Sequence, residues 1–279
     1  MRNPPRFYRY IRQAIGHRLE PQRPESQHGM WLDRGLDAMR KLDYQAAVQY
    51  FEKAVKDLPT SHAIWYGFGM ALYYVGQDES ALEAFTHAAQ LQPRSHLAWY
   101  GRGMVLSEID REEEALAAFD QAISLQPYSH LAWLAKGMTL VNMQRFQDAM
   151  AVFETALHEH SQTAQIWYGL GAAQLQVEHY ADALTAFETS LRLQDTFELA
   201  WYGKGLVLAH DKHFEEALEA FGAAITLNPN GSLSWFQKAE VLTTLEYLDD
   251  ARTAYERVVQ LSPVSNPLHQ QAQQKLQQL

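Results

Sequence analysis

Four histidines recur at a fixed interval of 34 residues: His28, His62, His96 and His130. Imidazole is the commonest metal ligand in proteins, so this spacing raises the question of a metal site. A fixed period of this length indicates a stack of small repeated units, in which equivalent residues stand about 10 Å apart, the distance between packed helices. Bonds from zinc to imidazole are only about 2 Å long. We therefore predict that these histidines are helix-entry residues rather than metal ligands.

Other patterns that could support catalysis are missing from the sequence. There is no cysteine, which excludes a thiolate metal site, a cysteine nucleophile and a disulfide framework. No phosphate-binding loop of the form GxxxxGK[ST] is present. The sequence therefore predicts a protein that is not an enzyme and that carries no metal and no cofactor.

The seven tryptophans are also 34 residues apart, and each one opens the same pattern of residue types. A small residue follows four positions later, an alanine sixteen later and an aromatic twenty later, with proline twenty-eight later in five copies. The tryptophans are Trp31, Trp65, Trp99, Trp133, Trp167, Trp201 and Trp235. The small residues are Gly35, Gly69, Gly103, Gly137, Gly171, Gly205 and Ala239, and the aromatics are Phe51, Phe85, Phe119, Phe153, Phe187, Phe221 and Tyr255.

This pattern resembles the tetratricopeptide repeat, which reads W-x2-L-G-x2-Y, then A-x3-F, then P. The match covers residues 28–265 without insertion or deletion and departs mainly in having leucine at the tyrosine position. The resemblance implies an all-α fold, a right-handed superhelical solenoid of antiparallel helix pairs. The seven repeats would be residues 28–61, 62–95, 96–129, 130–163, 164–197, 198–231 and 232–265.

The spacing has a physical explanation if each unit is a pair of amphipathic helices. Glycine or alanine on one helix lets the other approach closely. The tryptophan and the later aromatic then fill the space between helices, each burying about 150–250 Å². Proline follows the second helix because it cannot continue one. Ser61, Ser95 and Ser129 stand where N-caps of the next units are expected.

The last residues, 266–279, have the pattern of a helix that closes the stack. Asn266 is a good N-cap and Pro267 a good first helical residue. Leu268, Ala272, Leu276 and Leu279 fall on one face, and glutamines cover the other. We interpret this segment as a C-terminal capping helix.

Charge is unevenly distributed along the chain. Residues 1–27 carry six arginines and two glutamates, a balance of +4, and the rest carries 17 basic and 31 acidic side chains, a balance of −14. The acidic body argues against nucleic acid as a partner. No run of 18 apolar residues and no secretory signal are present. With no cysteine, these features favour a cytoplasmic protein.

The sequence predicts a basic amphipathic arm over residues 1–27, in which Tyr8, Ile11, Ile15 and Leu19 recur at helical spacing. Three interpretations stay open. The arm could fold against the first repeat or the concave groove, it could dock on an anionic membrane or a partner, or it could be a flexible tail. The second interpretation would make the protein a membrane-peripheral adaptor.

The resemblance also implies a binding face. In this family the second, fifth, sixth, ninth, and twelfth or thirteenth positions of the first helix line the concave side. Here these positions are apolar, aromatic and rich in methionine, and they lack the lysine, arginine and asparagine that grip carboxyl-terminal tails. The residues selected as partner-binding are Tyr66, Met70, Tyr73, Tyr74, Tyr100, Met104, Met138, Tyr168, Tyr202 and Phe236.

Two interpretations of this face compete. Glycine occupies the sixth position four times (Gly67, Gly101, Gly169 and Gly203), although glycine in a helix costs about 0.5–1 kcal/mol relative to alanine. Either a partner's backbone approaches closely there, or the glycines only make space for a tyrosine of the adjacent repeat. The tyrosines themselves could equally pack on their neighbours.

The function that these residues favour is a non-catalytic interaction scaffold or assembly factor. Its partner would be a protein or peptide, including one in helical form, held in the apolar groove. The sequence leaves the oligomeric state undetermined, and homo-oligomers through the end repeats or the groove are one alternative.

Deleting residues 266–279 is expected to lower solubility and melting temperature together, because it would expose the apolar end of the last repeat. Light scattering and a thermal melt of the full and shortened chains check this. An unchanged melting temperature would contradict the interpretation of this segment as a cap.

Overall fold

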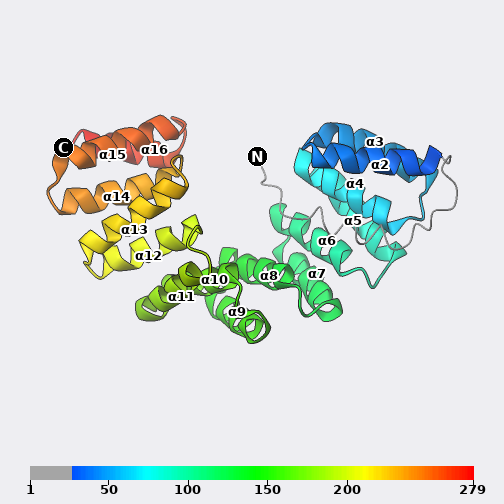
Figure 1. The fold of residues 1–279 in the computed structure, drawn as a ribbon, viewed down its shortest axis with the longest axis horizontal. Coiled ribbons are helices and arrows are strands. Elements are labelled where there is room, and N and C mark those ends of the chain that lie inside the picture. The colour runs from blue at the N-terminus through cyan, green and yellow to red at the C-terminus, as the bar shows by residue number, and fades with distance from the viewer. Residues whose placement is uncertain (1–26) are drawn as a thin grey trace. The chain divides into compact units, whose positions relative to one another are not determined.

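The computed structural model describes residues 27–279, and within this range the chain forms fifteen α-helices and no strand (Figure 1). This arrangement confirms the predicted all-α class. The three interpretations of the basic arm concern residues that lie outside the described part. The helices are α2 (Gln27–Arg40), α3 (Tyr44–Asp57), α4 (His62–Val75), α5 (Asp78–Leu91), α6 (His96–Glu108), α7 (Glu112–Leu125), α8 (His130–Asn142), α9 (Phe146–His160), α10 (Ala164–Gln176), α11 (Tyr180–Leu193), α12 (Glu198–His210), α13 (Phe214–Leu227), α14 (Ser232–Thr244), α15 (Leu248–Leu261) and α16 (Pro267–Leu276).

The chain divides into two compact units, residues 1–139 and residues 140–279, with the boundary inside α8. In each unit the helices come in pairs, an even-numbered first helix followed by an odd-numbered second helix. First helices of successive pairs touch one another: α2 with α4, α4 with α6, α10 with α12 and α12 with α14. Second helices contact the first helices on either side of them. We call the layer of first helices the inner face of each unit, and the layer of second helices its outer face.

Every pair turns through one residue in the left-handed backbone conformation. These residues are Leu42, Gly76, Asp110, Gln144, Glu178, Lys212 and Glu246, with φ between 56° and 84°. The residue that follows donates its backbone N–H back into the first helix, as from His213 N to Leu208 O at 2.8 Å. This geometry satisfies carbonyls at the helix end that would otherwise lack partners. One turn of constant length therefore maintains the 34-residue period.

A single buried ring joins each pair to the next. Phe85, on the second helix α5, is fully buried. A Cβ added to Gly69, on the first helix of the same pair, would lie 3.0 Å from this ring, and one added to Gly101, in the next pair, only 2.5 Å from it. The ring thus occupies a slot between two glycines. The same arrangement holds Phe51 between Gly35 and Gly67, and Phe187 between Gly171 and Gly203.

The slot explains the glycines at the sixth position of the repeat. Added Cβ atoms at Gly67, Gly101, Gly169 and Gly203 would lie 2.5 to 2.7 Å from a phenylalanine of the preceding pair. The suggestion that these glycines admit a partner's backbone was therefore wrong. The alternative interpretation, that these glycines make space for a tyrosine of the adjacent repeat, assigned the space to the wrong aromatic residue. The space belongs to the second-helix phenylalanine.

The tryptophans hold the connections between pairs. Each described indole from the second repeat onward donates its Nε1–H to the backbone carbonyl six residues earlier, as from Trp99 to Pro93 at 3.0 Å and from Trp201 to Asp195 at 2.7 Å. The indoles are half-buried, whereas the phenylalanines are fully enclosed. Trp167 and Trp201 bond to Ser161 and Asp195, which replace proline in their repeats. A backbone acceptor tolerates either residue, so the bond survives the loss of the proline.

The pair α10–α11 buries two polar side chains, Gln174 and Ser190. Gln174 is buried at the position where five other described first helices have leucine: Leu72, Leu106, Leu140, Leu208 and Leu242. Its Oε1 has no hydrogen-bond partner among the described residues. Ser190, at an alanine position, is also buried, and its hydroxyl donates to Ala164 O at 2.8 Å. The amide of Gln174 is therefore the less well-satisfied of the two.

Helix α16 covers the end of the last pair. Its N-cap is Asn266, whose side chain accepts from Leu268 N at 2.9 Å, and Pro267 is its first residue. Ala272 and Leu276 pack with Tyr255 and other buried residues of α15. On its other side, Lys275 Nζ lies 2.8 Å from a carboxylate oxygen of Glu240 on α14. The segment therefore continues the inner layer by one helix.

Two helical glycines provide a matched test of the slot. Gly203→Ala is expected to lower the free energy of unfolding by about 1–3 kcal/mol, because the new methyl group would meet the Phe187 ring at 2.5 Å. Gly222→Ala in α13 should instead raise it by about 0.5–1 kcal/mol, because nothing lies within 4 Å of the added atom. Urea denaturation followed by circular dichroism measures both. A shift of the same sign in both variants would contradict the slot.

Gln174→Leu is expected to raise the free energy of unfolding by about 1–3 kcal/mol, because it removes a buried carbonyl oxygen that lacks a partner. The control is Gln176→Leu, at an exposed position two residues later, which should leave stability nearly unchanged. The same denaturation experiment decides. A loss of stability in Gln174→Leu would show that the amide makes a favourable contact.

Candidate functional site

The residues selected from the sequence all lie on first helices, but the structure gives them different exposures. In the first unit Tyr66 is only 5% exposed and Met70 is fully buried, and Tyr73 is also buried. Tyr74, Tyr100, Met104 and Met138 are half-buried. Tyr66 and Met70 therefore offer no surface to a partner in this conformation. Their replacement would test packing rather than binding.

The tyrosines of the first unit pack on one another. Tyr74 stacks on Tyr44 with ring centroids 4.6 Å apart, and its edge meets Tyr73 at 5.6 Å. Tyr66 and Tyr100 each lie against the phenylalanine of their own second helix, Phe85 and Phe119. Burial raises the pKa of Tyr66, Tyr74 and Tyr100 above the usual range, and neighbouring tyrosines add to the effect. These phenols stay neutral, so the surface is aromatic and uncharged.

In the second unit the equivalent aromatic residues stand in a regular row. Tyr168, Tyr202 and Phe236 are half-buried. Each lies against the aromatic residue of its own second helix, with centroids 6.0 Å apart for Tyr168 and Phe187, 6.0 Å for Tyr202 and Phe221, and 5.7 Å for Phe236 and Tyr255. The second helices thus hold one face of each ring and leave the rest at the inner face.

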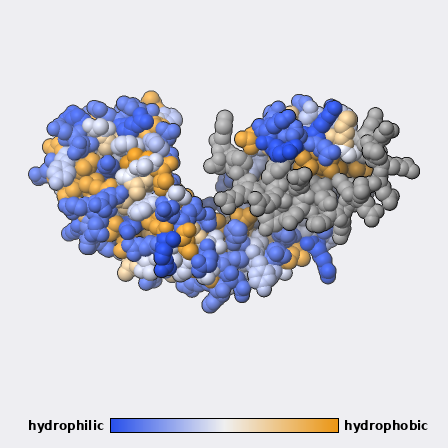
Figure 2. Space-filling view, viewed as in Figure 1, coloured by the Kyte–Doolittle hydropathy of each residue, from blue (hydrophilic) through white to orange (hydrophobic). Residues whose placement is uncertain are grey.

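Leucines at the second position of two first helices extend this row into solvent. Leu199 on α12 is 41% exposed and Leu233 on α14 is 54% exposed. Leu97 and Leu131, at the same position in the first unit, are less exposed, since both are half-buried. The sequence identifies all four as candidates for the concave face, but it does not show which of them remain uncovered. Their exposure is a property of the folded unit. Figure 2 shows hydrophobic surface interspersed among hydrophilic surface over this part of the chain.

The inner face of the second unit carries few charges. Glu240 accepts a hydrogen bond from the Tyr255 hydroxyl and pairs with Lys275, so its charge is compensated. Glu198 is half-buried at the start of α12. Burial raises its pKa, and a hydrogen bond with the Asn228 side chain opposes that rise. Burial is also the main cause of the raised pKa of Tyr168 and Tyr202, with a smaller effect of Glu198. The face is therefore apolar and aromatic, with Glu198 as its uncompensated carboxylate.

The recurring histidines are where the sequence predicts them. His62, His96 and His130 are the first residues of α4, α6 and α8. Burial lowers the pKa of His96. Residues 27–279 contain no group of three or more histidine, aspartate or glutamate side chains placed to hold a metal ion. In the same range no helix is both long enough and apolar enough to cross a membrane.

Comparison with known proteins places the chain in a family. The sequence model of the tetratricopeptide repeat matches residues 32–74, 66–130, 134–176, 173–232 and 211–266. Comparison with curated proteins finds no significant match.

Solved structures share the fold at low sequence identity. A chain of the APC/C hetero-tetramer Cut9–Hcn1 is 16% identical to the present protein, with a TM-score of 0.72. The match covers 90% of the present protein but only 46% of the longer Cut9–Hcn1 chain. A tetratricopeptide repeat protein from Parabacteroides merdae is 13% identical, with a TM-score of 0.70 over 90% of this chain and 97% of its own. YrrB, described as having an unusual peptide-binding site, is 23% identical, with a TM-score of 0.51 over 69% of this chain and 99% of its own.

Repeat matches that extend from residue 32 to residue 266, on a fold of paired helices joined by buried phenylalanines, give one conclusion. The chain is a member of the tetratricopeptide repeat family.

Proposed function

We propose that this protein is a non-catalytic scaffold or assembly factor that binds a segment of a partner protein on the inner face of its second unit. Three features support the proposal: membership of a repeat family, an inner layer that is apolar and aromatic, and the near absence of uncompensated charge on that layer. In a repeat array, extended surfaces rather than enclosed pockets bind partners.

The observation that carries the proposal is the exposure of Leu199 and Leu233. Single exposed leucines are ordinary on protein surfaces. These two, however, occupy the same position on consecutive first helices, α12 and α14, which contact each other. Half-buried Tyr168, Tyr202 and Phe236 follow at the fifth position of the same layer. Apolar side chains aligned in this way suit a partner segment that lies across several first helices.

The surface chemistry favours protein or peptide as the partner. Tyrosine provides a large, rigid contact area at low entropic cost. An amphipathic helix that places its apolar side in a hydrophobic groove is a common mode of recognition. YrrB, which shares the fold, is described as having a peptide-binding site, and this supports a peptide-sized ligand here.

The test uses a displayed peptide library panned against the full chain, followed by affinity measurements on the selected peptides. The double variant Leu199→Ser with Leu233→Ser should weaken binding at least tenfold, because serine removes most of the apolar area that these side chains contribute. Fluorescence polarisation of labelled peptides measures the change.

Leu248→Ser is the matched control, since Leu248 is 45% exposed but lies on the second helix α15. Circular dichroism shows whether all variants keep the wild-type helicity and melting temperature. Equal affinity of the inner-face double variant and the control would contradict the proposed binding face.

A further inference from the structure

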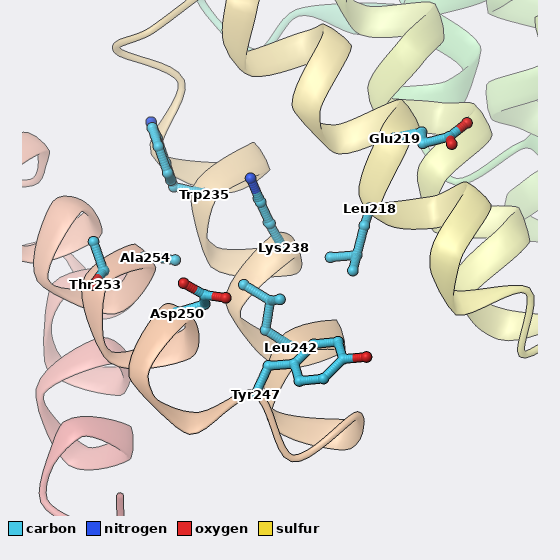
Figure 3. A pocket seen from close by; sticks show the side chains of 9 residues that line it. All are labelled: Leu218, Glu219, Trp235, Lys238, Leu242, Tyr247, Asp250, Thr253 and Ala254. Carbon is cyan, nitrogen blue, oxygen red and sulfur yellow. The ribbon is translucent and has the colours of Figure 1, made fainter.

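A groove opens on the outer face of the second unit, between the second helices α13 and α15. Figure 3 shows the side chains that line it. It has a volume of about 520 Å³ and is lined by Leu218, Glu219, Trp235, Lys238, Leu242, Tyr247, Asp250, Thr253 and Ala254. The residues from the first helix α14 form its floor. They belong to the side of α14 opposite to Leu233 and Phe236, so this groove is separate from the inner face.

Lys238 occupies a position that forms an ion pair in two other repeats. Lys136 Nζ lies 2.6 Å from Asp120 Oδ1, and Lys204 Nζ lies 2.8 Å from Glu188 Oε1. In both cases the lysine is on a first helix, and the carboxylate is sixteen residues earlier on the preceding second helix. These pairs bridge the same kind of cleft that is open beside Lys238.

The residue sixteen positions before Lys238 is Gly222, so the expected carboxylate is missing. No ion pair of Lys238 is found in the described part of the chain, and its ammonium group lies 5.8 Å from the centre of the Trp235 ring. Nothing lies within 4 Å of a Cβ added to Gly222. Phenylalanine rings occupy the space beside the slot glycines. No internal contact explains why residue 222, inside α13, is a glycine. The open space is on the surface, where a partner can approach.

A second repeat also lacks the carboxylate at this position. Arg102 holds the lysine position in α6, and the residue sixteen positions before it is Thr86. A groove of about 380 Å³ lies here, lined by Thr86, Trp99 and Arg102 among others. Arg102 instead approaches Glu114 of its own pair at 3.9 Å. The groove beside Lys238 is larger, and Lys238 has no such replacement partner among the described residues.

We propose that the outer groove between α13 and α15 is a second docking site, which accepts a partner segment carrying an aspartate or glutamate beside an apolar side chain. The partner's carboxylate takes the place on Lys238 that Glu188 takes on Lys204. The apolar side chain packs on Leu218 and Leu242 in the floor and wall of the groove.

Two carboxylates in the groove set the orientation of this segment. Glu219 is directed away from Lys238 in Figure 3, and Asp250 lies on the α15 wall. Because Asp250 repels a second carboxylate, the acidic side chain enters at the end where Lys238 and Trp235 lie. Uncharged or basic groups of the partner face Asp250. The ligand is therefore a segment with one localised acidic group rather than a uniformly acidic tail.

The experiment pans one displayed peptide library in parallel against the full chain and against its Gly222→Glu variant. The substitution supplies the missing carboxylate, which should form an internal ion pair with Lys238 and so occupy its ammonium group. Peptides retained only by the wild-type chain are synthesised, together with copies in which each acidic residue becomes its amide. We expect such peptides to contain an acidic residue, and to bind at least tenfold more weakly when that residue is the amide or when Lys238 is changed to methionine.

Lys204→Met is the matched control, because Glu188 already occupies the equivalent lysine. It should leave the affinity of these peptides unchanged, as should Leu199→Ser on the inner face. The proposal is overturned if both panning targets retain the same peptides, or if the selected peptides bind equally well as amides. Loss of binding in Leu199→Ser would assign the peptides to the inner face instead.

Discussion

The fit of one phenylalanine ring between two glycines is the contact on which the interfaces at Phe51, Phe85 and Phe187 depend. The ring on a second helix touches the backbone of its own first helix and that of the next, as Phe85 does at Gly69 and Gly101. A methyl group at either glycine would push the helices apart, and interiors packed at native density tolerate such changes poorly. The spacing between these neighbouring helix pairs is thus set by a steric fit inside the chain.

Because that fit is internal, the outer surface is free to vary. The ion pairs of Lys136 and Lys204 each join a first helix to the preceding second helix, but a partly exposed pair contributes little to stability. A repeat can therefore lose its carboxylate, as at Gly222, and keep its fold. The lysine then lacks an internal ion-pair partner. Such a change affects what the outer face can bind more than it affects the solenoid.

The inner face differs between the two units for a related reason. In the first unit the tyrosines are close enough to stack, as Tyr74 does on Tyr44, and much of their area is already buried within the chain. In both units the aromatic residue at the fifth position rests on its own second helix, but in the second unit Leu199 and Leu233 remain exposed. Apolar area that the chain does not bury itself is available to a partner. The apolar area left open on the inner face therefore depends on how each unit packs, not only on the residue types at these positions.

The sequence by itself determined the repeat, its length, the all-α class and the helix-entry place of the histidines, because these follow from residue types that recur every 34 positions. It could not decide what the sixth-position glycines are for, since a missing side chain serves a partner or a neighbouring ring equally well. Only the tertiary structure showed Phe187 against Gly203 and open space at Gly222. It likewise showed that Tyr66 is buried while Leu233 is exposed. The physical reason is that the burial of a side chain depends on its contacts with neighbouring helices. A periodic sequence pattern assigns the same role to equivalent positions in every repeat, whatever their neighbours are.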